Sequence, residues 1–317
     1  MKVKIFTALL PLVLLGLAGA VSGQDIVADR TWDLPKFSQP PTLDGDRFTV
    51  GDEWAGAFFK ACTVSEVIRE GGVFGWRDTE LLRGEVSAVQ LNQSEGEDAA
   101  EAKTDADAGG NIWHAWDDDA LYYVAEMRDN FRDVVGGAES APVAWWERDS
   151  ISLYIDLQNE KTGGDITGEY HNLNIINFVA APMNSSAVTR TLEITVQNAR
   201  ERTQEADQLE GFEYGFRDAG DEFGGDADYV IEGMFTWDAF IRGGNLPATP
   251  VVGTEIGFSW IILDPDGDDS FGGQLLCAGW ASEAANFATF VMSDAPAGPG
   301  GTAVEQDSWA RIKASFR

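Results

Sequence analysis

Most of the chain consists of short segments in which side chains of different polarity or size alternate from one residue to the next. The clearest is Asn111 to Asp129, NIWHAWDDDALYYVAEMRD, which has a period of two on either side of the acidic bend Asp117–Asp119. A period of two predicts β-strands, and an Asp-rich bend between two such runs predicts a hairpin. In the second arm two sets of side chains would lie on opposite faces: Leu121, Tyr123, Ala125 and Met127 on one, and Tyr122, Val124, Glu126 and Arg128 on the other.

Similar patterns predict a chain built almost entirely of strands. An extended segment is expected at 25–39, and strands at 61–68, 81–91, 149–157, 170–180, 187–197, 229–237, 255–263, 275–281, 287–292 and 309–316. A short helix is expected only near 237–241. The acidic stretch 94–110 and the charged, Gly-rich stretch 198–225 are expected to project as loops. Many short strands without a clear interior boundary predict one all-β domain over 24–317, an antiparallel, jelly-roll-like β-sandwich.

The first 23 residues have the pattern of a secretory signal peptide. Lys2 and Lys4 precede the apolar run Ile5–Leu17, and small residues follow it. The run is too short to cross a bilayer comfortably, which disfavours the alternative of an uncleaved anchor helix. We therefore expect a secreted, periplasmic or cell-surface protein without membrane insertion.

Charge narrows the range of partners. The formal net charge is −31, from 53 acidic and 22 basic residues. Such a surface repels phosphate backbones and anionic lipids, so nucleic acid is not an expected partner. Many of the carboxylates need do no more than keep the protein soluble.

Two groups of acids are candidates for a calcium site, because Ca²⁺ takes six to eight oxygen ligands and alternate acids on a tight loop supply several. One is the loop after the strand predicted at 255–263, and the other is an N-terminal loop. The ligands predicted in the first are Asp264, Asp266, Asp268 and Asp269, and in the second Asp44, with Asp46, Asp52 and Glu53 nearby.

Cys62 and Cys277 are the only cysteines. Export permits a disulfide between them, and two free buried thiols are the alternative. A bridge that closes so long a loop would stabilise the fold by about 4–5 kcal/mol in the chain-entropy model.

No catalytic signature stands out. Acid pairs are too common in this chain to identify a glycosidase, and Glu232 is expected to be a structural residue of its strand. His114 and His171 are too few for a metal site or a triad. A haem protein would have to draw its axial ligands from Met127, Met183 and these two histidines, without an attachment motif. A catalytic role is therefore not expected.

Six short motifs in order carry a family resemblance. PTLDG…DEWAGA, AWDDDALYYVAEMRD, WERDSISLYID, YVIEGMFTW, IGFSWIILD and a closing WARI resemble the family-9 carbohydrate-binding modules. The resemblance runs from about Pro40 to the C-terminus, with insertions near 62–110 and 198–225. It implies a secreted β-sandwich that binds the ends of polysaccharide or oligosaccharide chains, carries structural calcium and accompanies glycoside hydrolases, here in trans.

The resemblance also assigns residues. The sugar-stacking Trp of the family matches Trp146, whose neighbours Glu147 and Arg148 are further candidates. The polar residues that face the ligand match Asn172 and Asn174. Ser152 stands where the family often has a Glu that bonds sugar hydroxyls, and Asn172 stands where an Arg is common.

The second stacking Trp of the family has no counterpart, because no aromatic lies between Met292 and Trp309. Trp76, in the Gly-flanked sequence GGVFGWRD, is a candidate replacement, or else it packs the insertion onto the body. The expected function is thus a non-catalytic glycan-binding module. The alternative is a structural or interaction protein that keeps the sandwich without the sugar site, and a glycosidase component ranks third.

Overall fold

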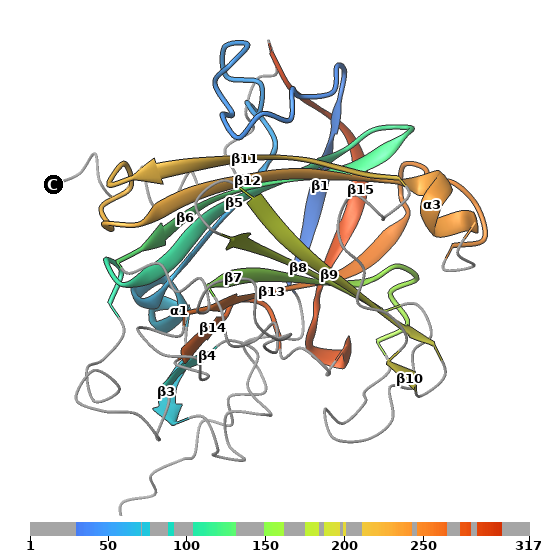
Figure 1. The fold of residues 1–317 in the computed structure, drawn as a ribbon. Helices are drawn as coiled ribbons and strands as arrows, with labels where there is room; N and C mark the ends of the chain where they lie inside the picture. The colour runs from blue at the N-terminus through green and yellow to red at the C-terminus, as the bar shows by residue number, and fades with distance from the viewer. Residues whose placement is uncertain are drawn as a thin grey trace, which may run out of the picture.

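The computed structural model describes the chain in segments: residues 30–70, 72–76, 88–91, 104–130, 149–161, 175–183, 187–196, 199–200, 211–242, 246–264, 273–279 and 284–299. The strands form two packed layers, as the prediction of a β-sandwich requires (Figure 1). The signal peptide predicted at 1–23 and the strand predicted at 309–316 lie outside the described residues. No helix of the described segments is long and apolar enough to span a membrane.

The first layer has six main strands and a small extension. In order across the sheet, the strands are β10 (Ala199–Arg200), β9 (Ala187–Val196), β8 (Ile175–Met183), β7 (Ser150–Asp156), β13 (Glu255–Leu263) and β15 (Ala288–Ala297). All are antiparallel to their neighbours. The extension runs from β13 through β14 (Gly273–Leu276) and β4 (Ala88–Leu91) to β3 (Val73–Trp76).

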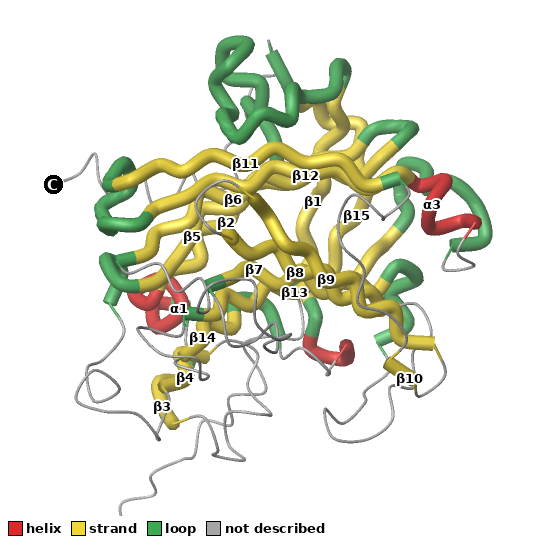
Figure 2. Tube along the Cα trace, viewed as in Figure 1, coloured by secondary structure: helices red, strands yellow, loops and turns green. Residues whose placement is uncertain are grey.

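The second layer has five strands: β2 (Phe58–Thr63), β5 (Ala108–Trp116), β6 (Ala120–Asp129), β12 (Asp228–Thr236) and β11 (Phe212–Gly220). Strand β1 (Thr31–Phe37) joins the layers, because it pairs parallel to β15 over most of its length and meets β5 at Lys36 and Trp116. The strands and short helices are seen together in Figure 2.

The predicted hairpin is confirmed as β5 and β6. At the bend, Asp117 Oδ1 accepts hydrogen bonds from the backbone N–H groups of Asp119 and Ala120, each at 2.8 Å. The Tyr122 hydroxyl donates to the other Asp117 oxygen at 2.8 Å. A single aspartate therefore fixes both the turn and the side chain of Tyr122 on the outer face of β6.

The core lies between the layers and is rich in aromatic rings. Trp260 and Phe258 of β13, Phe290 of β15 and Tyr123 of β6 are all buried there. Trp260 and Phe290 meet edge to face, with ring centroids 5.9 Å apart. Aromatic residues bury large apolar areas, so these strands contribute much of the hydrophobic stabilisation.

A second hydrophobic cluster lies on the opposite face of the second layer. The loop 38–57, drawn in blue at the top of Figure 1, crosses this face and packs Trp54 against Phe37, at a centroid distance of 5.2 Å. Phe37 in turn meets Tyr122 at 5.4 Å. Residues 120–125 of β6 are consequently buried on both faces, which explains why this half of the strand is apolar at every position.

The described segments also contain three short helices: α1 (Val64–Arg69), α3 (Trp237–Arg242) and the 3-10 turn η5 (Ala284–Asn286). Helix α3 confirms the helix predicted near 237–241. Helix α1 shows that the strand predicted at 61–68 was wrong in its second half. There the Thr63 hydroxyl accepts a hydrogen bond from the Glu66 N–H and caps the helix.

The stretch 198–225 was also predicted wrongly in part. Rather than projecting as a loop, residues 212–220 form strand β11 at the edge of the second layer, paired along its length with β12. Its charged residues suit an edge position, where they discourage pairing with other chains.

Candidate functional site

Three buried carboxylates meet at one end of the sandwich. Asp129 ends β6, Asp149 directly precedes β7, and Asp264 directly follows β13. One oxygen of each lies within 4.8 Å of the others, and all three residues are at most 3% exposed. We call this group the carboxylate cluster.

Strand pairing brings the cluster together from distant parts of the sequence. Ser150 of β7 pairs with Leu263 of β13, so the residues just beyond them, Asp149 and Asp264, are neighbours. Asp129 comes from the other layer. Its backbone N–H donates to Oδ1 of the buried Asp228 at 3.1 Å. The cluster therefore spans both layers.

The chemistry of these donors suits a hard cation. Three negative charges held this close and away from water repel one another, and a bound cation or protonation relieves that repulsion. Carboxylate oxygens are the ligands that Ca²⁺ prefers, and three of them leave room for carbonyl or water oxygens in a shell of six to eight. The residues present thus fit calcium.

The predicted metal ligands do not all lie at one site. Asp264 belongs to the cluster, whereas Asp44 lies in the loop 38–57, where its Oδ1 accepts from the Asp46 N–H at 2.9 Å. Asp266, Asp268 and Asp269 lie outside the described residues. Asp129 and Asp149 were not predicted as ligands, because only the strand register brings them to Asp264.

The residues predicted to bind sugar lie mostly outside the described segments. This holds for Trp146, Glu147, Arg148, Asn172 and Asn174. Trp76 ends strand β3, which pairs parallel to β4, and its side chain is not among those described. The segment that carries Trp146 enters β7 through Asp149, so the carboxylate cluster fixes the point three residues after this Trp.

Strand β7 turns two hydroxyls away from the core. Ile151, Leu153 and Ile155 face the core, so Ser150 and Ser152 point to the other side of the layer. Both serines are fully buried, and their hydroxyls have no hydrogen-bond partner among the described residues. Ser152, at the position where the sequence resemblance implies a Glu, is therefore a buried hydroxyl on this face of β7.

Glu232 anchors the loop 38–57 to β12. Its Oε2 accepts from the backbone N–H groups of Gly45 at 2.7 Å and Asp44 at 2.9 Å, and its Oε1 accepts from Trp54 Nε1 at 2.9 Å. Burial raises the pKa of this carboxyl to about 7, although the three donors act in the opposite direction. With donors on both oxygens, Glu232 has the structural role expected of it.

His114 is fully buried in the aromatic core. Its Nε2 accepts from Trp260 Nε1 at 2.8 Å, and its Nδ1 faces the carbonyl of Tyr122 at 3.3 Å. Burial lowers the pKa of the imidazole to about 3, so the ring is neutral. Both nitrogens are engaged, which argues against His114 as an axial haem ligand. Of the other candidate ligands, the His171 residue and the side chain of Met183 are not described, and Met127 is buried in the core.

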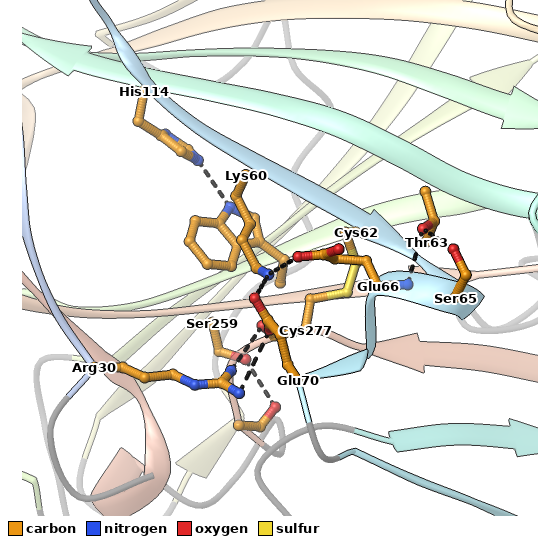
Figure 3. The surroundings of a disulfide bond; sticks show 12 residues. Arg30, Lys60, Cys62, Thr63, Ser65, Glu66, Glu70, His114, Ser259 and Cys277 are labelled. Atoms are coloured by element: carbon orange, nitrogen blue, oxygen red, sulfur yellow. Dashed lines mark hydrogen bonds and ion pairs between the residues drawn. A yellow bond between two sulfur atoms is a disulfide. The ribbon is translucent and has the colours of Figure 1, made fainter. Parts of the chain in front are cut away.

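Cys62 and Cys277 form the disulfide that the sequence left open (Figure 3). It ties β2 to the residue that follows β14, with the two Cα atoms 5.8 Å apart. Beside it, Lys60 Nζ lies 2.6 Å from a carboxylate oxygen of Glu70, which also pairs with Arg30 at 3.5 Å. The covalent link fastens the β2 edge of the second layer to the extension of the first, and the ion pairs join β2 to Glu70 at the end of α1 and to Arg30 before β1.

Comparisons with known proteins identify the family of the chain. A family model described as Carbohydrate family 9 binding domain-like matches residues 86–286, well over half of the 317-residue chain. The chain is similar to a carbohydrate binding module family 9 structure from Caldicellulosiruptor kristjanssonii in complex with cellotriose. It is 11% identical to that structure, with a TM-score of 0.48 and coverage of 86% of this chain and 97% of that one.

Two further structures show the same degree of likeness. For the module from the same organism in complex with glucose, the identity is 12% and the TM-score 0.46, and the match covers 83% of this chain and 96% of that one. For a putative carbohydrate-binding protein from Bacteroides uniformis, the identity is 11% and the TM-score 0.46, and the match covers 83% of this chain and 99% of that one. The search of curated proteins finds no match. From the extent of the family-model match, the chain belongs to the Carbohydrate family 9 binding domain-like family.

Proposed function

We propose that this protein is an exported, non-catalytic module that binds a polysaccharide or oligosaccharide by stacking a sugar ring on Trp146. Membership of a carbohydrate-binding family is the observation that carries the proposal. The C–H face of a pyranose is apolar and suits the π face of an indole ring. Polar groups beside the ring would bond the hydroxyls, and Glu147, Arg148, Asn172 and Asn174 are the candidates.

The ligand is a neutral or weakly charged glycan, because the net charge of −31 repels polyanions. A glycoside hydrolase is the expected partner in trans, since a binding module raises the local concentration of an enzyme on its substrate. Export through a signal peptide at 1–23 is part of the same proposal.

Calcium at the carboxylate cluster is the second part of the proposal. Asp129, Asp149 and Asp264 would hold the ion, whose positive charge would offset the repulsion among three buried carboxylates. Asp149 lies three residues after Trp146, so bound calcium would also fix the segment that presents the stacking ring. Calcium and glycan should then bind cooperatively.

Isothermal titration with cello- and xylo-oligosaccharides tests the glycan site. Trp146→Ala should abolish the heat of binding, while Trp76→Ala shows whether the ring in the first insertion is the second stacking partner. If no glycan in a broad panel gives heat with the wild-type protein, the proposal is refuted. The protein would then be a structural or interaction protein of the exported surface, as the missing second Trp and Ser152 favour.

Thermal unfolding with and without Ca²⁺ tests the metal site. A ligand at one hundred times its dissociation constant stabilises the folded state by about 2.7 kcal/mol. We expect Ca²⁺ to raise the Tm of the wild-type protein and of the control Asp44→Asn, and to have no effect on Asp264→Asn. An equal response of the two variants would exclude the carboxylate cluster as the site.

A further inference from the structure

A row of aromatic rings lies on the outer face of the second layer. Phe59 of β2 and Trp113 of β5 are register partners, and their ring centroids are 5.0 Å apart. The Arg47 guanidinium of the loop 38–57 lies 4.5 Å from the Trp113 centroid and 3.8 Å from the Phe48 centroid. Phe48, Arg47, Trp113 and Phe59 therefore form one continuous surface, which we call the aromatic row.

The two phenylalanines at its ends are open to solvent. Phe48 is 51% exposed and Phe59 is 40% exposed. Phe59 does not owe this to a loose strand, since its neighbours Phe58 and Lys60 are at most 7% exposed. The pleat of β2 turns Phe59 outward, at a position where a polar side chain would be cheaper to expose. Contiguous exposed rings are typical of a binding surface.

The row is held rigidly. Arg47 Nε donates to Glu126 Oε1 at 2.6 Å, and its Nη1 lies 3.4 Å from Asp52 Oδ1. The Arg47 and Glu126 side chains are only 18% and 10% exposed. The loop that supplies Arg47 and Phe48 is itself fixed by Glu232. Little side-chain freedom would be lost on binding, which favours affinity.

The chemistry of the row points to one class of ligand. Exposed apolar rings alternate with a guanidinium and carboxylates, a combination that matches the apolar C–H face and peripheral hydroxyls of a sugar ring. A nucleic acid, an anionic membrane or a second copy of this chain would bring further negative charge to a protein of net charge −31. A neutral glycan brings none.

We infer that the aromatic row is a second glycan-binding surface, separate from the Trp146 site, an inference that rests on the proposed glycan-binding function. Strand β7, which follows Trp146, belongs to the first layer, whereas the row lies on the outer face of the second. Two separate surfaces on one molecule would let it hold an insoluble polysaccharide by avidity.

The test compares insoluble cellulose and xylan with soluble oligosaccharides. Phe48→Ser and Phe59→Ser should each weaken adsorption to the polysaccharide about fivefold, the value of one aromatic contact, and should leave oligosaccharide affinity at Trp146 within about twofold. Phe59→Tyr, which keeps the ring, should restore adsorption and guards against a folding defect. Val251→Ser is the matched control, because Val251 is 66% exposed in the turn before β13.

Variants in the Trp146→Ala background separate the two proposals. Adsorption that survives Trp146→Ala and disappears on adding Phe48→Ser and Phe59→Ser supports the aromatic row. Adsorption by the Phe variants equal to that of Val251→Ser overturns the row and leaves the Trp146 site standing. An effect of the Phe variants without any effect of Trp146→Ala supports the row and refutes the Trp146 site. A wild-type protein that binds no glycan refutes both.

Discussion

Two buried titratable groups should give the protein an unusual dependence of stability on pH. His114 is neutral in the folded state because burial lowers the pKa of its imidazole to about 3, from 6.5. Glu232 is the opposite case, because burial raises the pKa of its carboxyl from 4.5 to about 7. Acidification is the perturbation. It lowers the contribution of His114 to the free energy of unfolding and raises that of Glu232.

The contribution of His114 is complete above pH 6.5 and is lost as the pH falls toward 3, because the unfolded chain takes up a proton that the folded protein refuses. Each pH unit in that window contributes about 1.4 kcal/mol. The free energy of unfolding should therefore fall by about 5 kcal/mol between pH 6.5 and pH 3 through His114 alone.

The contribution of Glu232 is complete below pH 4.5 and is lost as the pH rises toward 7, because the folded protein favours the protonated carboxyl. Its size is about 3 kcal/mol. Between pH 6.5 and 4.5 the two effects nearly cancel, so these groups add no slope there in the wild-type protein. Below pH 4.5 only the His114 contribution still changes, and between pH 4.5 and pH 3 it lowers the free energy of unfolding by about 2 kcal/mol.

Urea unfolding followed by Trp fluorescence, at fixed calcium and at pH values from 3.5 to 7, measures these terms. His114→Gln keeps a donor and an acceptor but does not titrate, so it should gain stability on acidification from pH 7 to 4.5, relative to wild type. Glu232→Gln should lose stability over the same range. The differences from wild type cancel the contributions of the other acids. Parallel pH profiles for all three proteins would refute the reasoning.

Two further predictions concern stability at neutral pH. Replacing both Cys62 and Cys277 by Ser opens a loop with a sequence separation of 215 and should lower the free energy of unfolding by up to about 5 kcal/mol; an unchanged urea midpoint would contradict a bridge that stabilises the fold. Gly45→Ala should cost about 1–3 kcal/mol, because φ is +85° and a Cβ would lie 2.7 Å from the Arg217 nitrogen. Gly51→Ala is the control, because φ is +75° there but an added Cβ would meet nothing within 4 Å. An equal loss of Tm in both variants would mean that backbone strain alone is responsible, without the contact to Arg217.

The sequence was most informative where a clear local pattern, such as alternation or a turn, decides the structure. The hairpin β5–β6 could be predicted because its alternation and the Asp117 turn are local, and the bounds predicted for β13, 255–263, match those observed. Helix α1 was missed although Thr63 and Glu66 have the spacing of a capping box, because the β-branched residues around them favour a strand. Strand β11 was missed because its charged residues hide the alternation of Phe212, Tyr214 and Phe216.

The carboxylate cluster could not be predicted as a unit. Asp129, Asp149 and Asp264 stand at the ends of three different strands, and only the pairing of Ser150 with Leu263 brings two of them together. A chain with 53 acids contains many equally plausible sets. The aromatic row could not be predicted either, because the contact of Phe59 with Trp113 depends on the register of β2 against β5.

The parallel pairing of β1 with β15 also decides how the protein responds to mechanical load. These are the first and last described strands, and they run side by side from Thr31 and Thr289 to Phe37 and Ala297. A pull on the two ends of the chain therefore shears their hydrogen bonds, which must break together rather than one after another. The disulfide encloses the chain from Cys62 to Cys277, so most of the sandwich carries no tension even after these strands separate. A module under such a force would therefore keep the part of the sandwich between Cys62 and Cys277 free of tension.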